Sequence, residues 1–99
     1  MEFEETGFKI GDLFKRNEEH PGHSVRNNEI THYHLINKRG INMYGDLVCL
    51  RIEIKEDGIE IRENYPTISS NEERKLIGHD FIGNVKGMKI KDLGVIIDD

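Results

Sequence analysis

The chain has 99 residues, with fourteen isoleucines and eight asparagines but no alanine, glutamine or tryptophan. Alanine is the best helix former, whereas isoleucine favours half-buried sheet surface, so this composition argues against a helical bundle or coiled coil. The net charge of −5, from 14 basic and 19 acidic side chains, excludes a basic nucleic-acid-binding arm and is too dilute for an acidic mimic of DNA. The length predicts one compact domain over residues 1–99.

Cysteine content and hydropathy indicate a compartment. Cys49 is the only cysteine, which excludes an internal disulfide framework and suits a reducing environment. The acidic start Met1–Glu5 is unlike a signal peptide, and the longest apolar run, Leu47–Leu50, is far too short to span a membrane. We therefore expect a soluble cytoplasmic protein with no membrane partner.

The first half of the chain predicts a short helix and then a strand. Ile10, Leu13 and Phe14 have i, i+3, i+4 spacing, which predicts an amphipathic helix over residues 8–16. Residues 30–37 are typical of a strand, and the following Lys38-Arg39-Gly40 predicts a turn that leads to residues 41–44.

A β-hairpin over residues 50–62 is the clearest structural signal. Apolar and charged residues alternate on both sides of Asp57-Gly58, which favours a two-residue type I′ turn. That turn sets Ile54 opposite Ile61 and pairs opposite charges across the strands. A register shifted by two residues would instead set like charges opposite one another, which favours the first register. The predicted isoleucine face, which is expected to lie in the core, consists of Ile52, Ile54, Ile59 and Ile61.

The last third of the chain predicts a second helix and a final strand. Two overlapping capping boxes, Ser69/Glu72 and Ser70/Glu73, predict a helix that begins near residue 70 and ends at Gly78 or Gly83. Residues 87–97 are typical of a strand. The fold class predicted from these elements is α+β: a small, mostly antiparallel sheet of four or five strands with one or two short helices packed on one face.

Histidines are the most unusual chemical feature, and four of the five fall within fifteen residues. His20 and His23 flank a Pro-Gly turn, whereas His32 and His34 lie on one face of a predicted strand. If the turn folds over the strand, these four imidazoles would form a metal site of the kind that suits zinc. The spacing matches no established zinc motif, so no cofactor is the first expectation and zinc the alternative.

Charge along the chain is polarised. Residues 20–45 carry three basic side chains and one acidic side chain, whereas residues 53–73 carry seven acidic and two basic side chains. Such polarity suits docking to another protein. The candidate partner-binding residues are Arg26, Tyr33, Lys38, Arg39 and Tyr44 on the basic side, or Glu53, Glu60 and Glu63 on the acidic side. The alternative is that both are merely solvated faces.

Single-stranded nucleic acid is a further candidate partner, because Tyr33 and Tyr44 would stack on bases beside basic residues. The sequence pI near 5.5 makes this alternative unfavourable. No nucleophile–base arrangement, glycine-rich phosphate loop or serine elbow is present, and Cys49 in an apolar strand is typical of a core residue. We therefore do not expect an enzyme.

Together these patterns predict a small non-catalytic cytoplasmic protein that binds another protein as a regulator or inhibitor. The isoleucine- and asparagine-rich composition is typical of low-GC bacteria and their phages. It is consistent with a phage or mobile-element protein that acts on a host system. The alternatives are a histidine-based metal site and a single-stranded nucleic-acid module. A homodimer through a sheet edge at residues 30–37 or 87–97 is also compatible with the sequence.

Overall fold

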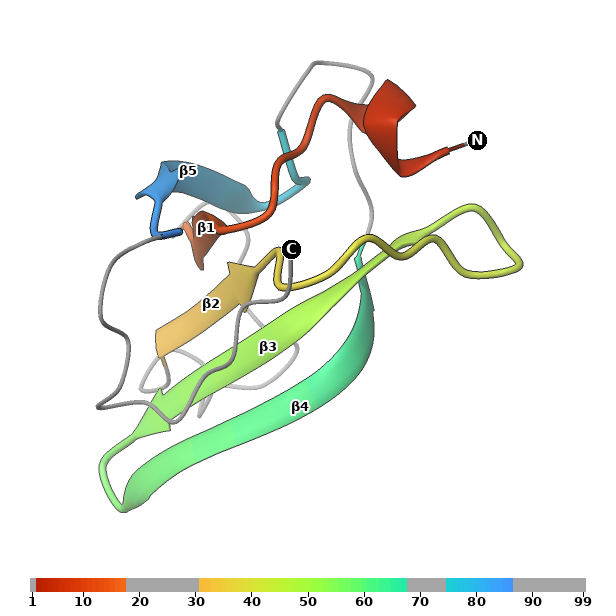
Figure 1. Cartoon of the computed structure of the whole chain (residues 1–99). Helices are drawn as coiled ribbons and strands as arrows, with labels where there is room; N and C mark the ends of the chain where they lie inside the picture. Colours follow the sequence, from red (N-terminus) through yellow and green to blue (C-terminus); the bar gives the residue numbers. More distant parts are fainter. Residues whose placement is uncertain (1, 18–30, 68–74, 87–99) are drawn as a thin grey trace.

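A computed structural model describes residues 2–17, 31–67 and 75–86 of the chain. They form one five-stranded antiparallel sheet in the order β4-β3-β2-β1-β5 (Figure 1). The elements are the 3-10 turn η1 (Phe3–Thr6) and the strands β1 (Asp12–Arg16), β2 (Thr31–Leu35), β3 (Leu47–Lys55), β4 (Gly58–Thr67) and β5 (His79–Asn84). The first four strands each pair with their neighbour in sequence, and β5 returns to pair with β1.

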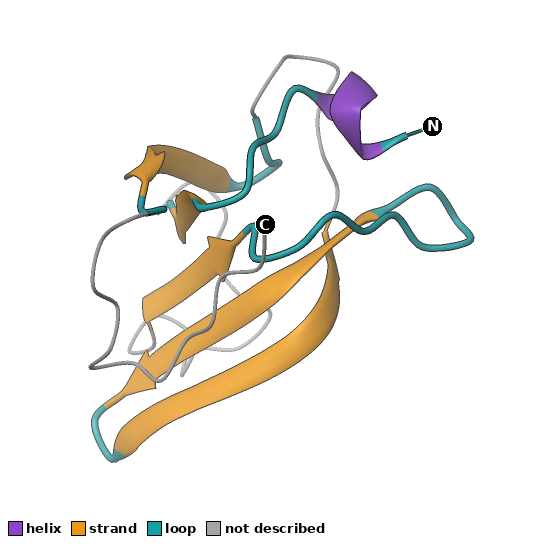
Figure 2. Cartoon of the chain, in the orientation of Figure 1, coloured by secondary structure: helices purple, strands orange, loops and turns teal. Residues whose placement is uncertain are grey.

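The predicted α+β fold class is wrong, because the described residues form a sheet with almost no helix (Figure 2). The segment predicted as a helix over residues 8–16 contains strand β1 instead. The segment predicted as a helix up to residue 83 contains β5 from His79 onward, although its predicted start near residue 70 lies outside the described residues. The strand predicted over residues 87–97 also lies outside them.

Strand β1 forms because its two apolar residues pack on opposite faces of the sheet. Phe14 belongs to a core cluster on one face, whereas Leu13 packs against the cluster on the other. A helix would put both side chains on one face. Gly11, directly before the strand, has a φ of 94°, and a Cβ there would lie 2.7 Å from the backbone nitrogen of Lys86. The chain therefore enters β1 through a turn that glycine permits.

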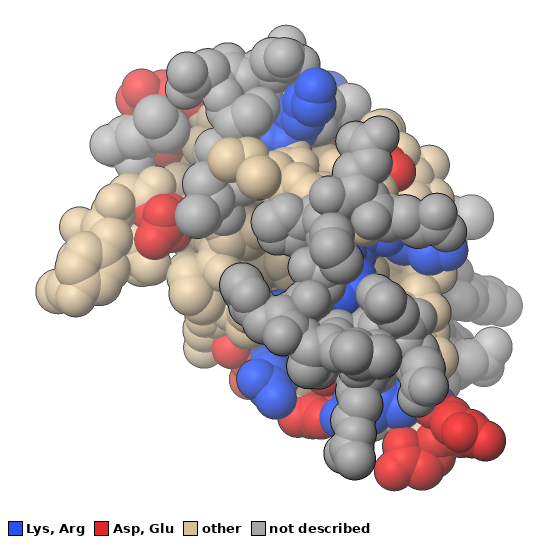
Figure 3. Space-filling view, turned by 180° about the vertical axis from the view of Figure 1, so that it is seen from behind, with Lys and Arg blue, Asp and Glu red and all other residues tan. Residues whose placement is uncertain are grey.

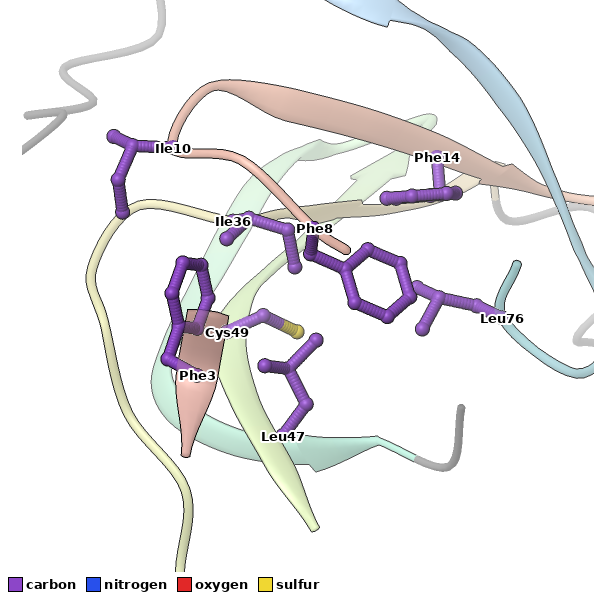
Figure 4. Packing of buried hydrophobic residues seen from close by; sticks show 8 residues of the cluster. All are labelled: Phe3, Phe8, Ile10, Phe14, Ile36, Leu47, Cys49 and Leu76. Carbon is purple, nitrogen blue, oxygen red and sulfur yellow. The ribbon is translucent and has the colours of Figure 1, made fainter. Parts of the chain in front are cut away.

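The sheet carries hydrophobic clusters on both faces. The larger cluster consists of Phe3, Phe8, Ile10, Phe14, Ile36, Leu47, Cys49 and Leu76 (Figure 4). The smaller one consists of Leu35, Leu50 and Ile52, with Leu13, Tyr33 and Val85 packed against it. Neighbouring residues such as Cys49 and Leu50 alternate between the two clusters, as the two-residue period of a strand requires. Cys49 is a fully buried core residue, as the sequence predicts.

The β3–β4 hairpin is present as predicted, but its predicted register is wrong. Ile52 lies opposite Ile61, Arg51 opposite Arg62 and Glu53 opposite Glu60, with Lys55 and Gly58 closing the turn. This is the register that places like charges directly across the strands. The turn residues are therefore 56–57, and Gly58 is the first residue of β4 with a φ of 147°.

The expectation that all four isoleucines of the predicted isoleucine face lie in the core is also wrong. Ile52 is buried, but Ile54, Ile59 and Ile61 remain 36%, 49% and 38% exposed. Within the described residues, no helix is long and apolar enough to cross a membrane.

Candidate functional site

His32 and His34 point to the same face of β2, as the two-residue period of the strand predicts, and both are buried. The other two histidines of the predicted metal site, His20 and His23, lie outside the described residues. The two strand histidines are surrounded by polar side chains from β3, β4 and β5. We call this group the histidine–arginine cluster, and it comprises His32, His34, Arg51, Tyr65, Thr67 and His79.

Arg51 contacts two other members of the cluster, Tyr65 and His32. Its Nη1 donates to the Tyr65 hydroxyl at 2.6 Å, and its guanidinium lies 4.6 Å from the centre of the Tyr65 ring. Its Nη2 contacts Nδ1 of His32. Because a guanidinium only donates hydrogen bonds, Nδ1 of His32 accepts, and the proton of the neutral ring is therefore on Nε2.

His34 is held by contacts from two other strands. Its Nδ1 lies 3.3 Å from the Thr67 hydroxyl on β4. Its ring stacks on His79 of β5, with 4.1 Å between centroids and an angle of 24°. The sequence did not indicate His79, Arg51 or Tyr65, because only the strand pairing brings them to these histidines.

The surroundings keep both imidazoles neutral. Burial, followed by the positive charge of Arg51, lowers the pKa of His32 to about 4. Burial, followed by the neighbouring His79, lowers the pKa of His34 to about 3. Both rings are therefore uncharged at neutral pH.

The cluster is poorly suited to a metal cation. The described part of the chain contains no group of three or more His, Cys, Asp or Glu side chains that could hold a metal ion. The Nε2 of His32 carries a proton when Arg51 occupies Nδ1, so neither nitrogen offers a free lone pair. The arginine charge also repels a cation. The four-histidine site stays a prediction because His20 and His23 lie outside the described residues, but the geometry of His32 does not favour it.

The acidic candidates do not form one acidic surface. Glu53 is buried, with its carboxylate 2.9 Å from Nε of Arg51, 3.7 Å from Nζ of Lys55 and 3.9 Å from Nε of Arg62. Glu60 lies 2.6 Å from Lys55 and 3.2 Å from Arg62. Figure 3 accordingly shows acidic and basic side chains beside one another at the lower right of the view.

Hydrogen bonding to Lys55 and then to Arg62 lowers the pKa of Glu60, and the hydrogen bond to Glu60 raises the pKa of Lys55. The third candidate, Glu63, is exposed on β4. Glu53 and Glu60 thus form ion pairs within the hairpin itself. These ion pairs explain how the hairpin tolerates a register in which like charges lie directly opposite one another.

The basic candidates are also dispersed. Tyr33 packs against the smaller core cluster, and Arg39 forms an ion pair with Glu4 at 3.0 Å. The amine of Lys38 contacts the side-chain oxygen of Asn64. Arg26 lies outside the described residues. Of these candidates, Tyr44 is the most available for a partner, because its side chain is 81% exposed.

Tyr44 is displayed together with Met43, which is 88% exposed, on the connection between β2 and β3. This connection projects from the right side of the molecule in Figure 1. Its turn is ordered by Asn42, whose side-chain oxygen accepts from the backbone nitrogens of Tyr44 at 3.0 Å and Asp46 at 2.9 Å. Backbone bonds from Asn42 to Asp46 and from Gly45 to Asn42 complete the turn. We call residues 42–46 the Met43–Tyr44 turn.

Met43 was not among the residues predicted from the sequence. The available signal was the pattern Asn42-Met43-Tyr44-Gly45, in which two large side chains stand between typical turn residues. Comparison of the chain with protein-family models, with curated proteins and with solved structures found no match.

Proposed function

We propose that this protein is a non-catalytic protein-binding module, a regulator or inhibitor, and that the Met43–Tyr44 turn is its principal contact with the partner. The observation that carries the proposal is the exposure of Met43 and Tyr44 on a turn tied by four hydrogen bonds. Isolated exposed apolar residues are ordinary, but two adjacent large ones, each more than four-fifths exposed on an ordered turn, are a reason to look for a partner.

Physical properties of the two side chains support this role. Tyrosine is enriched among the residues that dominate binding energy, because it buries a large rigid surface and keeps a hydroxyl for hydrogen bonding. Methionine adapts its shape to a partner pocket. The ordered turn lowers the conformational entropy lost on binding, since the backbone already has a defined conformation.

Basic residues lie at the base of the same connection. Lys38 and Arg39 precede the turn, and Arg39 is well exposed beside its partner Glu4. An apolar centre with a charged margin is the usual organisation of a protein–protein interface. The partner surface should therefore offer an apolar pocket with acidic or polar groups around it.

We keep the partner class and the compartment predicted from the sequence, which are another protein and the cytoplasm. We place the protein in the cytoplasm, where its single cysteine would stay reduced. Its composition supports a phage or mobile-element origin and a target in the host cell.

The test is affinity capture from a lysate of the source cell, followed by titration calorimetry with the captured protein. The Met43→Ser/Tyr44→Ser variant should lose a partner that the wild-type chain retains in stoichiometric amount, and its affinity should fall by about a hundredfold. The matched control is Ile77→Ser/Ile82→Ser, which removes two half-exposed apolar side chains elsewhere in the molecule. Capture of no stoichiometric partner, or equal binding by both variants, would contradict the proposal.

A further inference from the structure

The outer edge of β4 is a second surface with interaction potential. Among the described strands, β4 has a neighbour on one side only, and its residues from Gly58 to Asn64 are mostly exposed. An exposed edge strand offers unpaired backbone groups to another strand. We propose that this edge pairs with the β4 edge of a second copy of the chain, in an antiparallel two-fold arrangement centred on Ile61.

The hairpin register determines which backbone groups face outward. Lys55 and Gly58 close a two-residue turn, so they form a hydrogen-bonded pair, and such pairs recur at every second residue. Gly58, Glu60 and Arg62 therefore direct their backbone groups toward β3. Ile59, Ile61 and Glu63 direct theirs to the free edge, where they can form a ladder with a second copy.

Charge selects one register for this ladder. A two-fold axis perpendicular to the sheet keeps each side chain on its own face of the combined sheet, whichever residue it passes. We compare the three centres in the middle of the exposed stretch, residues 60, 61 and 62. A centre at Glu60 sets that carboxylate against its own copy, and a centre at Arg62 does the same with two guanidiniums. A centre at Ile61 sets each Glu60 opposite the Arg62 of the second copy, which gives two attractive contacts.

The same register relieves the like-charge pairing inside each hairpin. Across β3 and β4, Arg51 lies opposite Arg62 and Glu53 opposite Glu60. In the paired dimer, the arginine pair of one copy lies next to the glutamate pair of the second copy. Across the four strands the order is therefore Arg51, Arg62, Glu60, Glu53, with the last two from the second copy. The contacts between the two copies therefore add to the ion pairs that each hairpin already forms along its diagonals.

The opposite face of the paired strands is apolar at its centre, with Glu63 of each copy at the two ends of the ladder. Ile61 would contact its own counterpart at the two-fold axis, with Ile59 and Ile54 beside it. These three side chains keep between one third and one half of their surface exposed in the single chain. The pairing would cover part of that surface and so add a hydrophobic contribution to the backbone ladder.

Features at the far end of β4 limit the length of the ladder. Asn64 has a φ of 54°, and the register shifts between Cys49 and Arg51 opposite this segment. Pro66, two residues further on, lacks a backbone donor. The pairing is thus confined to residues 58–63, which predicts a weak dimer that forms at high protein concentration.

The test is sedimentation equilibrium of the purified chain up to millimolar concentration. The wild-type chain should show a monomer–dimer equilibrium. Glu60→Lys and Arg62→Glu should each raise the dissociation constant by about tenfold or more, because both attractive contacts become repulsive. An equimolar mixture of the two variants should recover association, since each variant then faces its charge complement. The matched control is Glu56→Lys in the turn, which makes the same charge change outside the ladder.

A second measurement fixes the register without altering any charge. Ile61→Cys should form an intermolecular disulfide under mild oxidation, because the two introduced thiols meet at the axis. Ile59→Cys should do so much more slowly, because that position lies opposite Glu63 of the second copy. A wild-type chain that stays monomeric throughout, or equal cross-linking at the two positions, would overturn the proposal.

Discussion

Two neutral imidazoles buried on one strand make the stability of this protein dependent on pH. In an unfolded chain, histidine takes up a proton near its ordinary pKa of about 6.5. In the folded chain His34 stays neutral until the pH falls to about 3, and His32 until about 4. The unfolded state therefore binds more protons than the folded state below pH 6.5, so stability is lost as the pH falls through this window.

The variant His34→Gln tests this relation. The wild-type chain should lose about 3 kcal/mol of unfolding free energy between pH 7 and pH 4 because His34 resists protonation. The variant lacks this titration, so its unfolding free energy should depend less steeply on pH. Urea denaturation at several pH values measures both slopes. Equal slopes for the two proteins would show that His34 does not contribute.

At the residue scale, the sequence predicted which side chains share a face but not which ones meet. His32 and His34 lie together because they are two residues apart on one strand, a relation that requires no tertiary information. Arg51 and His79 reach them from other strands. Their positions depend on the pairing of β2 with β3 and on the return of β5, and neither is encoded in local spacing.

At the element scale, the charged face of the β3–β4 hairpin depends on Glu53. This carboxylate is buried and lies within 4 Å of three basic side chains, Arg51, Lys55 and Arg62. We expect Glu53→Gln to destabilise the chain by about 2 kcal/mol, because it leaves Arg51 partly buried without its nearest negative charge.

Chemical denaturation of Glu53→Gln and of the exposed control Glu63→Gln measures the difference between buried and exposed sites. The control should change the unfolding free energy by less than about 0.5 kcal/mol. A similar small effect at both positions would mean that the ion pairs of the hairpin contribute little.

The hairpin also shows why its register could not be predicted from directly opposite charges. Each carboxylate is neutralised by basic side chains two residues along the same strand or on the diagonal, as Lys55 does for Glu60. Pairing rules that count only facing residues miss these contacts. The alternation of apolar and charged residues nevertheless predicted both strands, because a two-residue period is a local property.

At the scale of the whole molecule, Gly11 joins three parts of the sheet. Its nitrogen donates to Ile36 at 2.7 Å, and its carbonyl accepts from Val85 at 2.8 Å. Gly11→Ala should destabilise the chain by about 3 kcal/mol, since the φ of 94° is strained for alanine and its Cβ would strike the Lys86 backbone.

Gly45→Ala is the matched control, because Gly45 also has a positive φ, 83°, but has nothing within 4 Å of the added Cβ. It should cost only about 1 kcal/mol of conformational strain. Thermal and urea denaturation of both variants separate strain from steric conflict. If the two variants were equally stable, the close approach of Lys86 would have no energetic effect.

The fold class could not be predicted because the apolar spacing in the first part of the chain is ambiguous. Ile10, Leu13 and Phe14 fit a helical period, but Leu13 and Phe14 serve different faces of a sheet with a core on each side. Helical spacing distinguishes a helix from a strand only when one face is buried. The tertiary arrangement, rather than the local pattern, determines the outcome here.

The return of β5 to the far edge of the sheet has a consequence for how the chain folds. Strands β1 to β4 form a meander of sequence neighbours, whereas β5 follows β4 yet pairs with β1 at the opposite edge. Contacts between distant segments form late, because closing a long loop costs entropy before any contact compensates. We therefore expect the meander to assemble first. Docking of β5 then places Phe81 against Phe14, and His79 against His34, in the final step of folding.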